Sequence, residues 1–74
     1  MKKTPLATRL GRAIRARRTA TGLSQDRFAD KIDMHRAYFA AIERGEKNIT
    51  LPTLQRIAGG LKVRMADLLL DIER

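Results

Sequence analysis

The segment from Arg18 to Gly45, RTATGLSQDRFADKIDMHRAYFAAIERG, constrains the fold most, because its residues predict two short helices joined by a tight turn. Gly22 suits the left-handed conformation that commonly ends a helix, and Ser24 can cap the next helix by accepting a backbone N–H. One helix is therefore expected to end and another to begin within three residues.

The spacing of apolar residues predicts two helices inside this segment, over residues 25–32 and 36–44. Asp33 interrupts the apolar pattern between them, at a position where Gly or Asn would be easier, and either Asp33 or His35 could cap the second helix. The apolar residues of the first helix fall on one face, which can be buried: Phe28, Ala29 and Ile32.

The helix predicted over residues 36–44 has an outward surface that is basic and otherwise small. Phe39 and Ile42 point toward the core, and the other faces carry Arg36, Ala37, Ala40, Ala41 and Arg44. Small side chains allow another surface to approach closely, although alanines are also simply good helix formers. The flanking arginines favour close approach to a partner.

Size and charge restrict the function classes. Seventy-four residues predict one domain over residues 1–74, too small for a catalytic cleft between domains, so no catalytic residue is expected. Sixteen Lys and Arg against eight Asp and Glu give a net charge of +8, which indicates a polyanionic partner such as double-stranded DNA. A membrane partner is not expected, because bulky aromatic residues are lacking on the basic first helix.

Metal, cofactor and export signals are missing from the sequence. The chain has no cysteine and a single histidine, His35, so neither a disulfide nor a metal site is expected. The pattern of a phosphate-binding loop is absent too, and no cofactor is implied. Because no apolar run approaches a membrane span or a signal peptide, a cytoplasmic location is expected.

The fold class predicted from these patterns is all-α. Thr4 and Pro5 open the first helix, Thr50 can cap the fourth helix with Pro52 in its first turn, and Gly59-Gly60 weakens the end of that helix. Five helices are expected, over residues 6–21, 25–32, 36–44, 51–60 and 66–72.

The arginines of the first helix are interpreted in two ways. Arg9, Arg12 and Arg15 fit a solvated face. Arg18 lies where the chain reverses, and Glu43 lies near a helix end where the dipole disfavours an acid. We therefore expect a partly buried Arg18–Glu43 ion pair that fixes the angle between helices.

The last helix carries more apolar surface than packing on a small core needs. Its apolar residues are Leu68, Leu69, Leu70 and Ile72. A homodimer interface that includes Leu70 and Ile72 is therefore expected.

Two motifs resemble a known family: R-x-x-x-G-L-S-Q at Arg18 to Gln25, and Phe39-x-x-Ile42-Glu43-Arg44-Gly45. They are similar to the lambda-repressor-like (XRE-type) helix-turn-helix DNA-binding proteins. The runs His35 to Phe39 and Glu43 to Leu51 further resemble the controller proteins of bacterial restriction–modification systems. The resemblance implies a compact five-helix regulator that binds palindromic operators as a homodimer, with residues 36–44 in the major groove.

The resemblance also implies roles by position. Base contacts are implied for His35, Arg36, Ala37 and Ala41, and Arg36 can donate two hydrogen bonds to a guanine. Phosphate or shape contacts are implied for Gln25, Tyr38, Arg44, Lys47, Asn48 and Thr50. Among the departures from the family pattern, Arg64 replaces a common Ser cap, and His35 replaces a frequent Ser, Thr or Asp.

Other functions remain open at this point. An antitoxin-type protein that neutralises a toxin, a phage-type repressor, and a nonspecific nucleoid or RNA-binding protein share these features. RNA polymerase is a further possible partner if the protein activates transcription.

Overall fold

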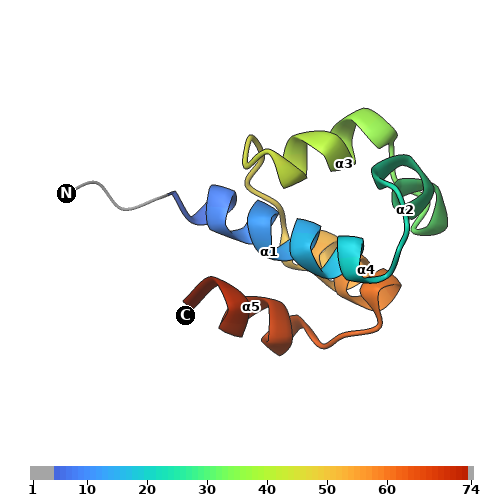
Figure 1. Ribbon diagram of the computed structural model, residues 1–74. Coiled ribbons are helices and arrows are strands. Elements are labelled where there is room, and N and C mark those ends of the chain that lie inside the picture. The colour runs from blue at the N-terminus through green and yellow to red at the C-terminus, as the bar shows by residue number, and fades with distance from the viewer. Residues whose placement is uncertain (1–4, 74) are drawn as a thin grey trace.

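The computed structural model describes residues 5–73, and within them the chain forms five α-helices and no β-strand (Figure 1). The helices are α1 (Leu6–Ala20), α2 (Gln25–Lys31), α3 (Arg36–Glu43), α4 (Leu51–Leu61) and α5 (Met65–Glu73). Each helix end lies within one residue of its predicted position. The all-α fold class is confirmed, whereas the predicted helix opening at Thr4 lies outside the described residues.

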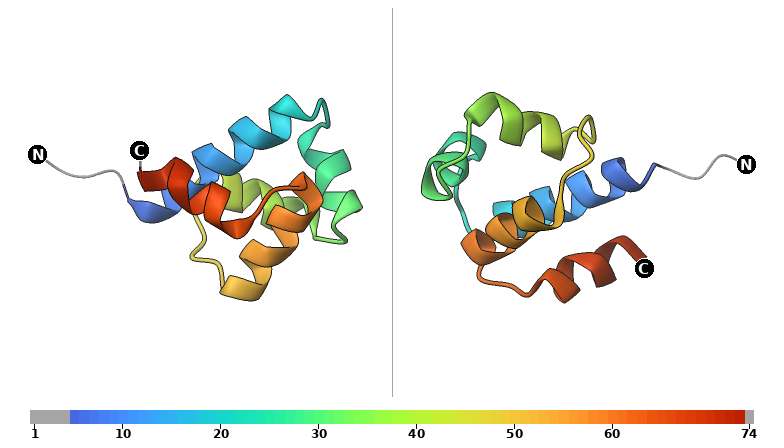
Figure 2. Two further views of the ribbon diagram at one scale, coloured as in Figure 1. Left: turned by 90° about the horizontal axis from the view of Figure 1, so that it is seen from below. Right: turned by 180° about the vertical axis from the view of Figure 1, so that it is seen from behind.

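Helix α1 lies between the other helices. It packs against α3 on one side and α5 on the other, while α2 packs against α3 and α4 contacts both α1 and α5 (Figure 2). This arrangement holds α2 and α3 together at one side of the molecule, away from α5.

Every helix contributes to one hydrophobic core. The rings of Phe28 in α2 and Phe39 in α3 lie 5.1 Å apart between centroids and are tilted by 41°. Such an aromatic pair stabilises the contact between the two helices. The largest fully buried side chains are Phe28, Phe39, Ile14, Ile42, Ile57 and Leu68.

The turn from α1 to α2 has the predicted form. Gly22 adopts a φ of +82°, where a glycine is not strained, and its N–H donates to the Thr19 carbonyl oxygen at 3.0 Å. The Ser24 hydroxyl oxygen accepts a hydrogen bond from the Arg27 N–H at 3.1 Å. Both the glycine stop and the serine cap are confirmed.

The turn from α2 to α3 differs from the predicted one. His35 precedes α3 without a side-chain capping bond, and Asp33 takes a φ of +55° instead of capping the helix. The Asp33 N–H donates to the Asp30 carbonyl oxygen at 3.1 Å and the Met34 N–H to that of Ala29 at 2.9 Å. These two bonds form a Schellman motif, so Asp33 occupies the left-handed position that usually takes a glycine.

The two remaining helices begin with side-chain caps. The Thr50 oxygen accepts from the Thr53 N–H at 3.3 Å, as predicted. Gly59-Gly60 does not end α4, which continues to Leu61 and stops at Lys62 with a φ of +59°. At α5 the Asp67 carboxylate accepts from the Arg64 N–H at 2.8 Å, and this bond compensates for the missing Ser cap.

Candidate nucleic-acid interface

A buried polar cluster joins the end of α3 to α1 and α2. Arg18 donates from Nε to Glu43 Oε2 at 2.7 Å and from Nη2 to Oε1 at 3.1 Å, so the predicted ion pair is present. Its Nη1 donates to the Leu23 carbonyl oxygen at 2.9 Å, and Gln25 Nε2 donates to Glu43 Oε1 at 2.9 Å. Because both carboxylate oxygens are bonded, the cluster holds α3 at a fixed angle to its neighbours.

Close packing of α1 on α3 also depends on Gly11, a residue that the sequence patterns did not single out. A Cβ atom at this position would lie 2.5 Å from the Glu43 carbonyl oxygen and 2.6 Å from that of Ile42. Only the approach of the two backbones reveals this requirement, because Gly11 lies inside a regular helical pattern.

The first turn of α3 forms an exposed surface. His35, Arg36 and Ala37 are exposed, and Tyr38 is 37% exposed. These residues are neighbours on one short stretch of helix, so the structure brings four of the predicted DNA-contact residues together.

Ala41 is a correction to the predicted set. Its side chain is buried, at 6% exposure, although the sequence placed it on the outward face. Both α1 and α2 pack against α3, so the buried stripe is wider than Phe39 and Ile42 alone would make it. The predicted base contact by the Ala41 side chain is therefore wrong, because this side chain is buried.

Arg36 lies beside two acids of α2 and is hydrogen-bonded to one of them, Asp30. It donates from Nε to Asp30 Oδ1 at 3.1 Å and from Nη2 to Asp30 Oδ2 at 2.7 Å, and Nη1 lies 3.5 Å from Asp26 Oδ2. The hydrogen bonds lower the pKa of Asp30 and raise the pKa of Arg36. No local signal in the sequence points to either contact, because Asp26 and Asp30 lie on α2 and meet Arg36 of α3 only across the turn between the two helices.

The predicted phosphate contacts gather around the loop from α3 to α4. Arg44 donates to both oxygens of Glu46 at 2.8 and 3.0 Å, and this contact lowers the pKa of Glu46. Lys47 and Asn48 are exposed in the loop, and Thr50 is exposed at the start of α4. Gln25 is half-buried, with its amide already bonded to the Glu43 cluster.

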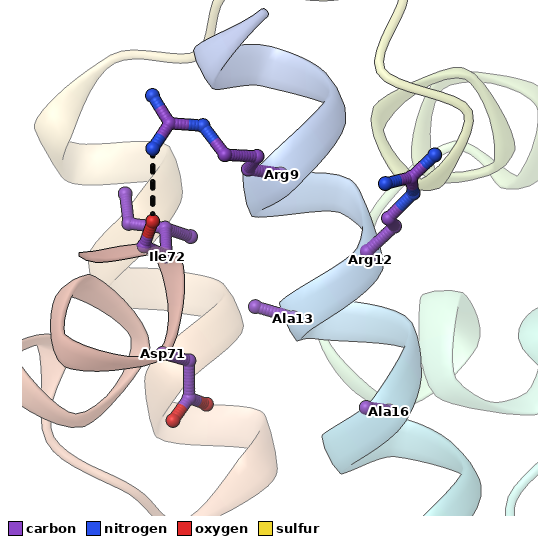
Figure 3. A pocket seen from close by; sticks show the side chains of 6 residues that line it. All are labelled: Arg9, Arg12, Ala13, Ala16, Asp71 and Ile72. Atoms are coloured by element: carbon purple, nitrogen blue, oxygen red, sulfur yellow. Dashed lines mark hydrogen bonds between the residues drawn. The ribbon is translucent and has the colours of Figure 1, made fainter. Parts of the chain in front are cut away.

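A cavity of about 370 Å³ lies between α1 and α5 (Figure 3). Arg9 donates from Nη1 to the Ile72 carbonyl oxygen at 3.0 Å, so Arg9 is not on the solvated face where the sequence placed it. Arg12 and Arg15 are exposed as expected. None of the predicted DNA-contact residues lines this cavity, which therefore lies outside the candidate interface.

The predicted dimer residues differ in exposure. Leu70 is 55% exposed, whereas Ile72 is buried at 7% beside α1. The last turn of α5 packs against α1, and an ion pair between Arg17 Nε and Asp71 Oδ2 at 2.6 Å joins the two helices. Ile72 is therefore part of the domain's own packing, and the interface role predicted for it is corrected.

The residues that the structure describes, 5–73, lack two further kinds of feature. They include no group of three His, Cys, Asp or Glu side chains that could hold a metal ion. Among these residues, no helix has the length and apolar character needed to cross a membrane.

Comparison with known proteins places the chain among DNA-binding regulators. A family model described as helix-turn-helix matches residues 14–68. The control protein C.MunI from Mycoplasma sp is 41% identical over 58 residues, which cover 78% of each chain.

Two solved structures are similar in fold. The clp gene regulator ClgR from Corynebacterium glutamicum superposes with a TM-score of 0.92 at 25% identity, covering 97% of this chain and 92% of that one. The restriction–modification controller protein C.Esp1396I, solved as a tetramer with its natural 35 base-pair operator, gives a TM-score of 0.81 at 28% identity. That match covers 97% of this chain and all of the other.

Proposed function

Because the chain belongs to the lambda-repressor-like (XRE-type) helix-turn-helix family, we propose that it binds palindromic operators as a homodimer and controls transcription in a restriction–modification system. It is a DNA-binding regulator and not an enzyme. Within this proposal the protein acts in the cytoplasm, associated with the nucleoid of a bacterium or the DNA of a phage.

One observation carries the proposal: the first turn of α3 is exposed, while the other end of this helix is fixed to the rest of the domain. His35, Arg36 and Ala37 are free of core packing, while Glu43 at the other end of the helix is fixed to Arg18. A rigid helix with an exposed amino-terminal turn suits insertion into the major groove. Arg36 would read a guanine, and His35 and Ala37 would contact neighbouring base edges.

Phosphate contacts would come from the residues on either side of α3. Lys47, Asn48 and Thr50 lie exposed in and after the loop, and Arg44 reaches the same region. Tyr38 could bond a phosphate or sense groove shape, and Gln25 could reach a phosphate only with the part of its amide that Glu43 leaves free. The net charge of +8 favours close approach to DNA as a whole.

The controller subtype rests on the similarity to C.MunI and C.Esp1396I. An antitoxin or a phage-type repressor would share the same DNA-binding face, and the genes beside this one separate these possibilities. A methyltransferase and endonuclease pair supports the controller, whereas a toxin gene supports the antitoxin. RNA polymerase would become a partner at any operator where the protein activates transcription.

Selection of bound sites from random duplex DNA, followed by footprinting of the enriched sequence, tests the proposal. We expect a two-fold symmetric site whose half-sites lie about one helical turn, or a multiple of it, apart. Failure to enrich any sequence overturns the regulator and leaves nonspecific binding, because salt-dependent affinity alone fits both.

A further inference from the structure

The contact between Arg36 and Asp30 uses one particular edge of the guanidinium. The bonds come from Nε and Nη2, so the carboxylate occupies the side edge of the planar group. The end edge, formed by Nη1 and Nη2, has the Asp26 carboxylate 3.5 Å from Nη1 without a hydrogen bond, so two donors remain for another acceptor. A guanine presents O6 and N7 with the spacing that such an edge can bond.

The position of Asp30 is unfavourable in two respects. Asp30 lies in the last turn of α2, where the helix dipole disfavours an acid. It also lies beside the surface proposed for DNA, where its charge repels phosphates. Its side chain is 55% exposed, so core packing does not require it.

We propose that Asp30 is a positioning residue that holds Arg36 by its side edge, so that the end edge is aimed at a guanine of the operator. This inference rests on the proposed DNA-binding function and deepens it. An arginine that is already held by Asp30 loses fewer side-chain conformations on binding than a free one. The affinity for the correct base therefore increases more than the affinity for a wrong base.

Asp26 provides a matched control on the same helix. It lies one turn before Asp30 and 3.5 Å from Arg36 Nη1, an ion pair in which no hydrogen bond forms. Asp26→Asn therefore removes the same charge but leaves both bonds to the side edge. Asp30→Asn places an amide nitrogen, which is a donor, opposite one of the two donors of Arg36.

The experiment measures dissociation constants of the full chain for its selected operator, for operators changed at the guanine pair, and for random duplex DNA. Asp26→Asn should tighten binding to all three alike and leave discrimination unchanged. Asp30→Asn should tighten random binding similarly but reduce discrimination at that pair by about threefold or more. Asp30→Glu, which keeps the carboxylate, should restore part of the loss.

Three results overturn the inference. One is that Asp30→Asn behaves like Asp26→Asn, because Asp30 would then act only through its negative charge. An increase in discrimination by Asp30→Asn counts equally against the inference, because Asp30 would then compete with the base for Arg36. The third is Asp30→Asn changing discrimination by the same factor in an Arg36→Ala background, because the effect would then not pass through Arg36.

A measurement without DNA separates this inference from the proposed function. In the free protein, exchange of the Arg36 Nε–H with water, followed by ¹⁵N NMR, should be slower than that of the exposed Arg12 and should speed up in Asp30→Asn. Equal exchange at Arg36 and Arg12 overturns the positioning role by itself. Slow exchange combined with failure to enrich any operator instead overturns the proposed function.

Discussion

Arg18 and Glu43, 25 residues apart in sequence, are joined by two hydrogen bonds in the interior of the protein. The Arg18 side chain is 9% exposed and the Glu43 side chain 3%. Two charges removed from water are tolerated because each oxygen of the carboxylate has a donor and the guanidinium also reaches the Leu23 carbonyl. The pair therefore acts as a brace between α1 and α3, and its loss has a predictable cost.

Replacing Arg18 with Met should lower the stability of the fold by about 3 kcal/mol or more, because Glu43 would stay buried without its cation. For a domain of this size the melting temperature should fall by about 10 °C or more. Thermal unfolding followed by circular dichroism measures the change. The double variant Arg18→Met with Glu43→Met should recover most of the loss, since no buried charge remains.

The opposite pattern would contradict the structural role of the pair. If the Arg18→Met variant melted like the parent while its affinity for DNA collapsed, Arg18 would belong to the DNA interface.

Arg36 and Lys47 should affect DNA binding in different ways. Arg36→Ala should lower preference at one base pair of each half-site by roughly tenfold, because a bidentate base contact is lost. Lys47→Ala should weaken binding to all sequences and reduce the salt slope by about one, because a phosphate contact is lost. Titrations with matched and altered operators at several salt concentrations distinguish them. Similar behaviour of the two variants would contradict the division into base and phosphate contacts.

Gly59 and Gly60 are neighbours in α4 with different surroundings. A Cβ at Gly59 would meet nothing within 4 Å, whereas one at Gly60 would collide with the side chains of Ile32 and Phe28. Gly59→Ala should therefore raise stability by about 0.5–1 kcal/mol through helix propensity. Gly60→Ala should lower it despite the same gain in propensity. Urea unfolding of both variants measures the difference, and stabilisation by both would contradict the close packing of Gly60 against Ile32 and Phe28.

Asp67 should make the stability of α5 depend on pH. The hydrogen bond from the Arg64 backbone N–H, followed by that from the Arg64 side chain, lowers the pKa of Asp67 below its ordinary value of 3.8. A lowered carboxyl pKa stabilises the folded state above the ordinary value, and the stabilisation is lost as the pH falls through the folded pKa. Asp67→Ala should thus lower the melting temperature by a few degrees at pH 7.

The difference between parent and Asp67→Ala should shrink as the pH is lowered from 5 to 2 in a series of thermal melts. Glu73→Ala removes an exposed acid at the other end of α5 and should not reproduce this behaviour. A difference that stays constant over the pH series would contradict the cap.

Leu70 should contribute to the proposed homodimer. It is 55% exposed on α5, and Asp at this position would place a charge in an apolar contact. Light scattering of the parent should give a mass above the 8.4 kDa of one chain, and Leu70→Asp should return it toward the monomer. Leu51→Asp, at a 68% exposed leucine of α4, is the matched control. A monomeric parent at tens of micromolar would contradict an interface at Leu70.

Local patterns in the sequence were sufficient for the helices and most of their ends. The spacing of Ile14, Phe28 and Phe39 with their neighbours defines the buried faces, and Gly22 and Ser24 mark one turn, because propensity and capping act within a few residues. Even the Arg18–Glu43 pair could be inferred, since an acid at a helix end and an arginine at a chain reversal both need compensation.

The tertiary structure decided the burial and the contacts that depend on which helices pack against each other. Ala41 is buried because two helices pack on α3, Ile72 because α5 lies against α1, and Gly11 is required because two backbones nearly touch. The Asp30–Arg36 contact likewise forms across the turn between two helices. The sequence by itself determined the helices, the basic character and the family, because these follow from local patterns. The fold alone decided which faces remain free to meet DNA, because exposure depends on contacts between helices distant in the chain.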